Sequence, residues 1–285
     1  MSEIRKCFTS RFPNGNLFEI DFNQLEVAAL AFLSQDANLI SDIRNDLDMH
    51  LVSLSWVIGQ PYETLKMLYD EGNPRVIAQR KAAKRPRFEL QYGAGPHTIA
   101  KNNNWPLDKA KAYIEKYYER YPNVKSWQNH VASIVEHNAK TVTGWTGGGS
   151  PERISHYMCP HTHRRYVFKT YPNKRGVHSF SPTQMKNYPV QGFATADLVP
   201  TVLGELVNVI YEEGLEDDIV LINTIHDSVL LDVATGTDML PVYRVFNRVV
   251  DIMKNRFNIT INVPIRWSVE TGKNWGEIKP LATSI

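Results

Sequence analysis

The sequence predicts an α+β fold, in which many helices are combined with a few antiparallel strands. Strand-like apolar segments are few and far apart, at 16–22, 219–233 and 259–267, whereas most intervening stretches have helical spacing. The segment 219–233 is expected to fold back on itself as a hairpin, which implies antiparallel pairing. Helices mixed with such strands are typical of the α+β class, and the chain shows no internal repeat.

Length and composition bound the answer only loosely. The chain has 285 residues, enough for one large domain or two smaller ones. A hydrophobic content of 42% is ordinary for a globular protein, and a net charge of +2 is too small to indicate a nucleic-acid partner. Cations do cluster locally, which fits phosphate binding and a solvated surface about equally well. The clusters are Arg75, Arg80, Lys81, Lys84, Arg85 and Arg87, and Arg164, Arg165, Lys169, Lys174 and Arg175.

The compartment is inferred from cysteine usage and apolar runs. The only cysteines, Cys7 and Cys159, do not suggest a disulfide framework, so a reducing compartment is expected. No apolar signal core follows Met1, and no apolar run reaches the ~18 residues of a membrane span. The sequence therefore predicts a cytoplasmic protein without a membrane partner.

The first half of the chain is expected to be mainly helical. A strand over 16–22 delivers Asp21 at its end, and residues 23–34 have helical spacing. Asp21 is therefore expected at a strand-to-helix junction, a usual place for ligand-directed groups. Short helices are expected over 36–71 and a basic helix over 74–92. Two more helices should begin near Pro106 and Pro122 and run to about Tyr118 and Ala139.

The second half is expected to begin irregularly. Residues 141–180 contain Gly144, Gly147-Gly148-Gly149 and several prolines, which indicate an irregular excursion with a β-hairpin. The apolar hairpin 219–233 then places His226 and Asp227 in its tight turn. The other expected elements are a helix at 189–213 with Gln191 near its start, a helix at 238–256 and a final strand from Ile259 to Trp267.

Two carboxylates are candidates for a shared site. Asp21 and Asp227 lie 206 positions apart, each at the end of an apolar strand. Taken singly, an aspartate in such a place is more often a turn or capping residue. If the fold brings them together, they repel unless a cation lies between them, and Mg²⁺ prefers oxygen ligands. Two such ions, about 4 Å apart, would suit nucleotidyl transfer.

A cationic and aromatic stripe is expected on the basic helix. Arg80, Lys84, Phe88 and Tyr92 recur every four residues, and each step of four turns about 400°, so the four share one broad face. Two cations can grip a triphosphate, and an aromatic ring can stack on a base or sugar. The alternative is a surface helix with its basic residues in solvent and its aromatic residues packed inward.

Together these motifs resemble the polymerase region of the A-family DNA polymerases, the bacterial DNA polymerase I group. Three of them match family motifs A, B and C in order, and weaker matches span nearly the whole chain. The main matches are Asp21-Phe22-Asn23-Gln24-Leu25-Glu26, Arg80-x3-Lys84-x3-Phe88-x3-Tyr92-Gly93 and His226-Asp227-Ser228. The weaker ones are Asp48-Met49-His50, Tyr118-Glu119-Arg120-Tyr121-Pro122, Asn187-x3-Gln191-Gly192 and Gly272-Lys273-Asn274-Trp275.

The resemblance implies a template-directed DNA polymerase that adds dNTPs to a primer 3′ end with two Mg²⁺ ions. It also implies a role for each matching residue. Metal would be held by Asp21, Asp227 and the carbonyl of Phe22. The triphosphate would be bound by Arg80, Lys84 and His50, and Lys84 would also be catalytic. The nucleotide would be contacted by Phe88, Tyr92, Gln24 and the steric gate Glu26, and the primer–template by Gln24, Asn187, Gln191 and His226.

The implied architecture is a right hand without its thumb. Residues 1–50 and 141–285 would form the palm, an antiparallel sheet with helices, and 51–140 the helical fingers. Motif A begins only 21 residues from the first methionine, so we expect the C-terminal half of a split phage polymerase in the host cytoplasm. A second polypeptide would carry the thumb and a 3′–5′ exonuclease. A segment trimmed at this boundary is the alternative.

The sequence departs from the family pattern at four positions, and Ser228, Glu89 and Pro86 among them favour a competing hypothesis, a non-catalytic DNA-binding or scaffolding subunit. Ser228 stands where an acidic residue commonly follows Asp227, and Thr183 where an arginine often reaches toward DNA, for which Lys186 could partly substitute. Glu89 replaces a glycine and adds negative charge near the nucleotide, and Pro86 should kink the fingers helix.

Two further expectations concern chemistry. Phe88 has no phenolic hydroxyl to replace the substrate's missing 3′-hydroxyl, so we expect discrimination against dideoxynucleotides, whereas Glu26 argues against an RNA polymerase. A zinc site is not expected, because the potential ligands are too tightly spaced. Those residues are His156, Cys159, His161 and His163, in a segment whose basic and aromatic residues we expect to contact the template.

Overall fold

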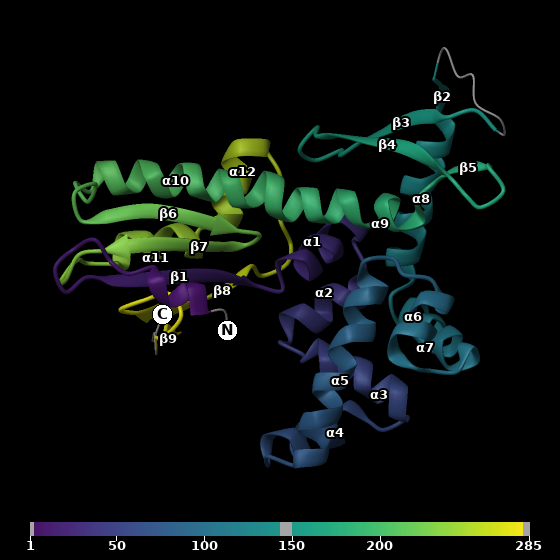
Figure 1. Cartoon of the computed structure of the whole chain (residues 1–285), viewed down its shortest axis with the longest axis horizontal. Coiled ribbons are helices and arrows are strands. Elements are labelled where there is room, and N and C mark those ends of the chain that lie inside the picture. The colour runs from purple at the N-terminus through teal and green to yellow at the C-terminus, as the bar shows by residue number, and fades with distance from the viewer. Residues whose placement is uncertain (1–2, 143–149, 282–285) are drawn as a thin grey trace. The chain divides into compact units, whose positions relative to one another are not determined.

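The computed structural model describes residues 3–142 and 150–281, which form two compact units. Unit 1 consists of Met1–Ala28 and Gln191–Ile285, and unit 2 of Ala29–Val190. Both combine helices with antiparallel sheet, so the α+β class is confirmed (Figure 1). The assignment of 1–50, 51–140 and 141–285 to palm and fingers stays a prediction, since these boundaries are not those of the units.

Unit 1 contains a five-stranded antiparallel sheet in the order β6-β7-β1-β8-β9. The predicted first strand is confirmed as β1 (Asn16–Asn23), which occupies the centre because Leu17, Ile20 and Phe22 are fully or almost fully buried. The predicted hairpin is confirmed as β6 (Ile219–Ile225) and β7 (Ser228–Val233). The remaining strands are β8 (Arg266–Gly272) and β9 (Lys279–Pro280).

The predicted final strand, Ile259–Trp267, is wrong over most of its length. Only its last two residues belong to β8, which begins at Arg266. Ile259, Ile261 and Val263 are buried, but they pack from an irregular segment outside the sheet. Pro264 has no N–H to donate to a ladder, and it separates this segment from the paired strand.

The helices near the two ends of the chain differ in detail from the prediction. The expected helix 189–213 is instead α9 (Pro182–Gln191), which begins earlier, then a π-helical turn, η2 (Gly192–Leu198), and α10 (Val199–Glu212). The expected helix 238–256 consists of α11 (Leu240–Asn247) and α12 (Val249–Phe257), both packed on α10. The chain begins with a short 3-10 helix, η1 (Glu3–Cys7).

A helical run from Pro182 to Glu212 is long and apolar enough to pass a length-and-composition test for a membrane span. The expectation that no apolar run reaches that length is therefore wrong. The evidence for a span is weak, because 44% of the most apolar window is buried inside the protein and a core helix of a soluble protein passes the same test.

The helices of unit 2 follow the predicted order, with one addition. The basic helix is confirmed as α5, which starts at Pro74 beyond the capping side chain of Asn73 and continues through Pro86. A helix that the sequence analysis missed, α6 (Pro96–Asn103), opens with a proline in its first turn. The others are α1 (Leu25–Ser34), α2 (Ala37–Arg44), α3 (Met49–Ile58), α4 (Tyr62–Asp70), α5 (Pro74–Gln91), α7 (Leu107–Arg120) and α8 (Pro122–His137).

The expected irregular excursion is more regular than predicted. It forms a four-stranded antiparallel sheet in the order β2-β3-β4-β5, whose central pair is the expected hairpin. The glycines Gly144 and Gly147–Gly149 lie outside the described residues. The strands are β2 (Lys140–Thr141), β3 (Arg153–Met158), β4 (Arg165–Pro172) and β5 (His178–Phe180).

A buried carboxylate joins α2 to the end of α7. Asp42 is only 5% exposed and accepts hydrogen bonds from Arg120 Nε and Nη2 at 2.9 and 2.6 Å. It also accepts one from the hydroxyl of Tyr121, which is fully buried, at 2.6 Å. Charge-assisted bonds of this kind are strong, and loss of one buried partner leaves the others unsatisfied.

We therefore expect Asp42→Asn to lower the free energy of unfolding by about 2–4 kcal/mol, because the negative charge and one of the two acceptor oxygens are lost and the new amide N–H groups face other donors. Urea unfolding followed by circular dichroism measures this loss. Asp70→Asn is the matched control, since the Lys66–Asp70 pair is exposed and solvent screening should leave it little effect on stability. Equal losses in the two variants would contradict the assignment.

Candidate functional site

The central sheet of unit 1 brings the two candidate aspartates together. Asp21 lies opposite Ser228 in the β1–β7 register, and Ser228 directly follows Asp227 in the β6–β7 turn. The backbone N–H of Phe22 donates to the carbonyl of Asp227 at 3.3 Å. His226 takes up a left-handed conformation, with φ of 56°, which closes the turn. Two residues that are 206 positions apart in sequence thus become neighbours on adjacent strands.

Burial and mutual repulsion make the charged forms of this pair unfavourable. The pKa of Asp21 is raised from 3.8 to about 6, first by burial of its carboxyl group and then by the charges of Asp227, Glu19 and Glu270. Burial also raises the pKa of Asp227, against the opposing effects of a backbone hydrogen bond and of His226. Carboxylates in this condition gain stability when a cation lies between them. The Asp21 side chain is exposed, so solvent screens part of the repulsion.

Glu19 is a member of this acidic group that the sequence analysis missed. It lies two residues before Asp21 on the same face of β1, and it is opposite Glu270 of β8. One Glu19 oxygen, Oε1, accepts from the hydroxyl of Ser228 at 3.1 Å, and Oε2 accepts from the indole N–H of Trp275 at 2.9 Å. Residues two apart in a strand point to the same face, so the position of Glu19 two residues before Asp21 was the signal that could have identified it.

The donor set fits a hard divalent cation. Asp21 and Asp227 offer carboxylate oxygens, and Mg²⁺ is usually held by one or two carboxylates while it keeps several waters and substrate oxygens. Within residues 3–142 and 150–281 no group of three or more His, Cys, Asp and Glu side chains is arranged to hold a metal.

The other predicted residues of unit 1 lie at three places. Gln24 and Glu26 are at the start of α1, Gln191 is just before η2, and His226 is in the β6–β7 turn. Gln24 is exposed with φ of 53°, and its carbonyl accepts from the N–H groups of Val27 and Ala28, so it begins the helix that follows β1. Glu26 and Gln191 are half-buried, and His226 is exposed. Motif A therefore turns from strand to helix at Gln24, between the end of β1 at Asn23 and the start of α1 at Leu25.

The predicted stripe on α5, in unit 2, is accessible. Phe88 and Tyr92 are 43% and 37% exposed, and their rings stack with centroids 6.4 Å apart. Tyr92 caps the C-terminal end of the helix, and Lys84 is exposed. The alternative in which the aromatic residues pack inward is therefore wrong.

Asp48 organises the cationic end of this stripe. Its Oδ1 accepts from the backbone N–H groups of His50 and Leu51 at 2.9 and 3.1 Å, which caps α3. Its Oδ2 accepts from Arg80 Nε at 2.6 Å. One carboxylate thus fixes both Arg80 and the backbone of His50. The spacing of an aspartate just before a helix was the signal for this cap.

His50 is neutral at physiological pH. Burial lowers its pKa from 6.5 to about 4, while Asp48 opposes the shift and Arg80, Lys84 and Arg87 add to it. Its ring lies 5.6 Å from that of Phe88. Its Nδ1 is buried without a hydrogen-bond partner among the residues described. The ring therefore offers a hydrogen bond to an anion in place of a full charge.

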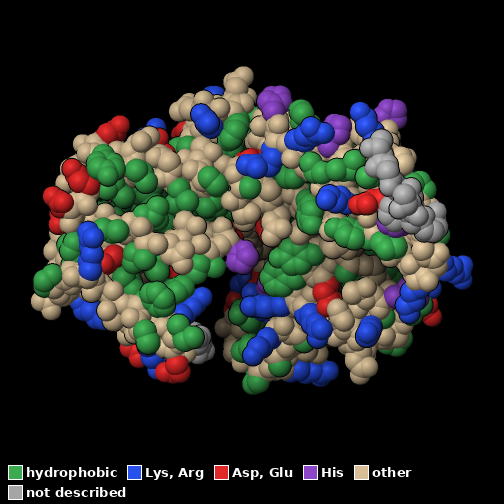
Figure 2. Space-filling view, turned by 45° about the horizontal axis from the view of Figure 1, so that its top comes forward, with side chains coloured by type: hydrophobic (Ala, Val, Ile, Leu, Met, Phe, Trp, Pro, Cys, Tyr) green, Lys and Arg blue, Asp and Glu red, His purple; other side chains and the backbone are tan. Residues whose placement is uncertain are grey.

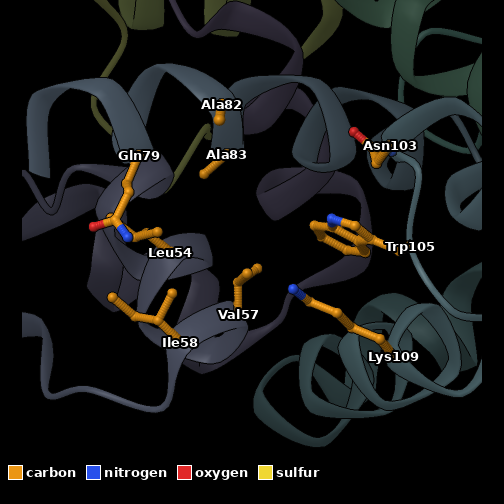
Figure 3. A pocket seen from close by; sticks show the side chains of 9 residues that line it. All are labelled: Leu54, Val57, Ile58, Gln79, Ala82, Ala83, Asn103, Trp105 and Lys109. Atoms are coloured by element: carbon orange, nitrogen blue, oxygen red, sulfur yellow. The ribbon is translucent and has the colours of Figure 1, made fainter. Parts of the chain in front are cut away.

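A hollow of about 290 Å³ lies on another side of α5 (Figure 3). Gln79, Ala82 and Ala83 contribute to it, and at about 100° per residue they point away from Arg80 and Lys84. None of the predicted site residues lines it. The remaining lining residues are Leu54, Val57, Ile58, Asn103, Trp105 and Lys109.

Comparison with known proteins decides the family. The sequence model described as DNA polymerase family A matches residues 1–277. The chain belongs to DNA polymerase family A. The predicted resemblance to this family is therefore confirmed.

Curated relatives include several bacterial DNA polymerase I proteins. That of Bacillus caldotenax is 26% identical over 277 residues, covering 97% of this chain and 28% of the relative. That of Borreliella burgdorferi is 28% identical over 279 residues, covering 97% and 26%. The thermostable enzyme of Thermus aquaticus is 27% identical over 272 residues, covering 95% and 28%. The chain thus spans little more than a quarter of the length of these relatives.

A solved structure supports the fold. The POL domain of Pol1 from M. smegmatis, in complex with DNA primer-template and dNTP, superposes with a TM-score of 0.64 at 20% sequence identity. The alignment covers 95% of this chain and 42% of that one. At this identity the likeness establishes the polymerase fold alone.

The departures from the family A pattern in α5 have structural explanations. Glu89 is directed at α6, where Asn102 and Asn103 donate to it at 2.9 and 2.7 Å, and Arg85 pairs with it at 3.2 Å. Arg87 is 3% exposed, with its guanidinium over the rings of Tyr117 and Tyr121. The cationic cluster seen in the sequence is therefore split, because Arg87 is directed into the core.

Lys186 is held by contacts within unit 2, and its partial substitution for the arginine expected at Thr183 stays a prediction. Its Nζ donates to the hydroxyl of Tyr118 at 3.3 Å, and burial lowers its pKa. Its stem also packs against Gly93, where φ is +80° and an added Cβ would lie 2.8 Å from Lys186 Cδ. Asn187 is half-buried, and its Oδ1 has no hydrogen-bond partner in the part of the chain that the structure describes.

The raised pKa of Asp21 predicts a pH-dependent cost in stability. Its pKa in the folded state, about 6, exceeds the ordinary 3.8, so as pH rises the unfolded chain loses this proton first. The cost appears between pH 4 and 6 and is complete above about pH 6. Asp21→Asn should therefore raise the melting temperature at pH 8, by about 2–4 °C if screening leaves about 1 kcal/mol.

Melting curves without added divalent metal at several pH values test this expectation. The gain of Asp21→Asn over the parent should shrink as pH falls toward 4. Glu212→Gln, at the exposed end of α10, is the control and should leave the pH dependence unchanged. A gain at pH 8 that persists unchanged at pH 4 would show that charge repulsion is not its cause.

Proposed function

We propose that this chain carries the catalytic palm and fingers of a template-directed DNA polymerase, which adds dNTPs to the 3′ end of a primer. The observation that carries the proposal is the juxtaposition of Asp21 and Asp227 in a chain of family A. The relatives named DNA polymerase I support the same activity. Nucleotidyl transfer needs metal ions at the reacting phosphate, and carboxylate oxygens hold such ions. The neighbouring carboxylates of Asp21 and Asp227 would supply these oxygens.

The acidic site would hold two Mg²⁺ ions through Asp21, Asp227 and the backbone carbonyl of Phe22. When bound, the ions would favour the deprotonated 3′-hydroxyl of the primer and neutralise charge on the reacting phosphates. Glu19 would keep the carboxylates in place, since it is itself fixed by Ser228 and Trp275. The site thus retains negative charge despite the serine at position 228.

The incoming triphosphate would be bound by Arg80, Lys84 and His50. Asp48 occupies the Nε of Arg80 and leaves both terminal nitrogens of the fork for phosphate oxygens. Lys84 is an exposed point charge that would stabilise the leaving pyrophosphate. Neutral His50 would donate one hydrogen bond without adding charge.

The remaining residues would select the nucleotide and its template. Phe88 would pack on the incoming nucleotide, and Tyr92 would guard the templating position. Glu26 would exclude a 2′-hydroxyl by its position under the sugar. Gln24 would contact both nucleotide and primer–template, the latter together with Asn187, Gln191 and His226.

The partners and setting of the polymerase are also proposed. Primer–template DNA and dNTPs are its substrates, and the cytoplasm, or the host cytoplasm for a phage protein, is its compartment. A second polypeptide with a thumb and a 3′–5′ exonuclease would supply duplex affinity, which depends on phosphate contacts. The phage source and the split arrangement stay predictions.

Primer extension at low salt with Mg²⁺ tests the activity. Asp227→Asn should lower the extension rate at least about 100-fold, because a metal ligand and its charge are lost. Asp251→Asn, on the exposed side of α12, is the control and should extend at the parent rate. A non-catalytic subunit would instead support a partner polymerase equally well with either variant.

A second expectation concerns Phe88. Without a phenolic hydroxyl it cannot compensate for a missing 3′-hydroxyl, so the parent should use ddNTPs poorly. Phe88→Tyr supplies one hydrogen bond and should raise the ratio of ddNTP to dNTP incorporation about tenfold. Tyr92→Phe is the matched control, because it removes a hydroxyl four residues away. Equal use of dNTPs and ddNTPs by the parent would contradict the role of Phe88.

A further inference from the structure

The sheet of unit 2 has one face that packs into the protein. The hydroxyl of Ser155 donates to the carbonyl of Val135, and the hydroxyl of Tyr166 donates to the carbonyl of Pro189. The ring of Phe168 stacks on that of Tyr188, with centroids 5.8 Å apart. These contacts bind the inner face to α8 and α9 and fix which side chains must point outward.

The opposite face is exposed and mixes cationic with apolar side chains. On β4 every second residue is exposed, and the register places Met158 beside Arg165 and Ile154 beside Lys169. Large apolar side chains on this face are between 38% and 53% exposed. We call this surface the outer face; it consists of Ile154, Met158, Arg165, Val167, Lys169 and Tyr171.

The segment that carries the outer face is strongly cationic. Between Arg153 and Ser181 there are six Lys and Arg residues and four His residues, with no Asp or Glu. Arg153 pairs with Glu136, but no ion pair of Arg165 or Lys169 occurs in the part of the chain that the structure describes. Figure 2 shows Lys, Arg and His side chains beside hydrophobic ones over the part of unit 2 that carries this sheet.

Folding alone explains neither the exposed cations nor the exposed apolar side chains of the outer face. A purely solvated face needs no Ile, Met, Val and Tyr side chains in the open, and contiguous exposed apolar surface usually marks a binding site. A protein partner would cover the apolar residues but would need matching carboxylates. A single nucleic-acid strand satisfies both, since its phosphates match the cations and its unpaired bases stack on apolar and aromatic side chains.

We propose that the outer face binds single-stranded nucleic acid and, on the proposed function, guides the unpaired template. Arg165 and Lys169 are four residues apart on one strand, about 13 Å, and would each contact one phosphate. Tyr171, at the end of the same row, would stack on a base. Duplex DNA would not use the apolar residues, because its bases are already stacked.

Fluorescence anisotropy with labelled primer–templates tests the proposal, in the absence of dNTPs and Mg²⁺. Two DNAs share one duplex and differ in their unpaired template overhang, of about two or about twelve nucleotides. The parent should bind the long overhang more tightly. Tyr171→Ala should lower that affinity about fivefold or more and leave the affinity for the short overhang unchanged.

Lys169→Gln supplies a second, electrostatic readout. Loss of one single-strand phosphate contact should reduce the slope of log affinity against log salt by about 0.7 for the long overhang. The matched controls are Lys101→Gln on α6 and Tyr211→Ala on α10, both exposed, and neither should change affinity or slope. All four positions are on the surface, so equal melting temperatures confirm that each variant is folded.

Three outcomes would overturn the proposal. The first is equal affinity of the parent for both overhangs. The second is unchanged binding by Tyr171→Ala and Lys169→Gln. The third is that polyglutamate displaces the strand equally well from the parent and from Tyr171→Ala. The last would mark a general anion patch. Primer extension is measured separately: if the parent binds the long overhang but never extends a primer, the proposed function fails while this inference stands.

Discussion

The antiparallel pairing of β1 with β7 is the constraint on which the candidate active site depends. Their ladder sets Asp21 opposite Ser228 and thereby brings it beside the turn that holds Asp227. A slip of one residue would move every side chain of β1 to the other face and turn Asp21 into the core. The register is held by the burial of Ile20 and Phe22, which share the face of β1 opposite to that of Asp21.

The same ladder explains how the site accommodates a serine after Asp227. Because Ser228 is directly across from Asp21, its hydroxyl can reach the preceding outward residue of β1, which is Glu19. A carboxylate is thus supplied by β1 in the neighbourhood where the family usually has one on β7. The charge of Glu19 contributes to the raised pKa of Asp21, and Glu19 Oε2 accepts a hydrogen bond from the indole N–H of Trp275. The acidic side chains of the site therefore come from β1 as well as from the turn before β7, and not from the Asp227 motif alone.

Sequence reasoning predicted those elements whose signals are local. The strand that carries Asp21, the hairpin around Asp227 and α5 have clear periodicity and clear ends. It failed at 259–267, because apolar alternation reports burial and does not show whether a backbone is paired. It also placed Arg87 with the phosphate-binding cations, although this side chain is buried against Tyr117. The direction of a charged side chain depends on tertiary neighbours, which composition does not reveal.

The departures in α5 illustrate how buried contacts support an exposed functional stripe. Pro86 costs the helix one backbone hydrogen bond, but the helix continues because residues on either side are anchored. Glu89 fastens it to α6 through two asparagine amides, and Arg87 packs on the aromatic rings of α7. Since these contacts join the three helices, any displacement of the stripe must carry α6 and α7 with it. Phe88 lies between the two anchors, so its position relative to them is set by the helix itself.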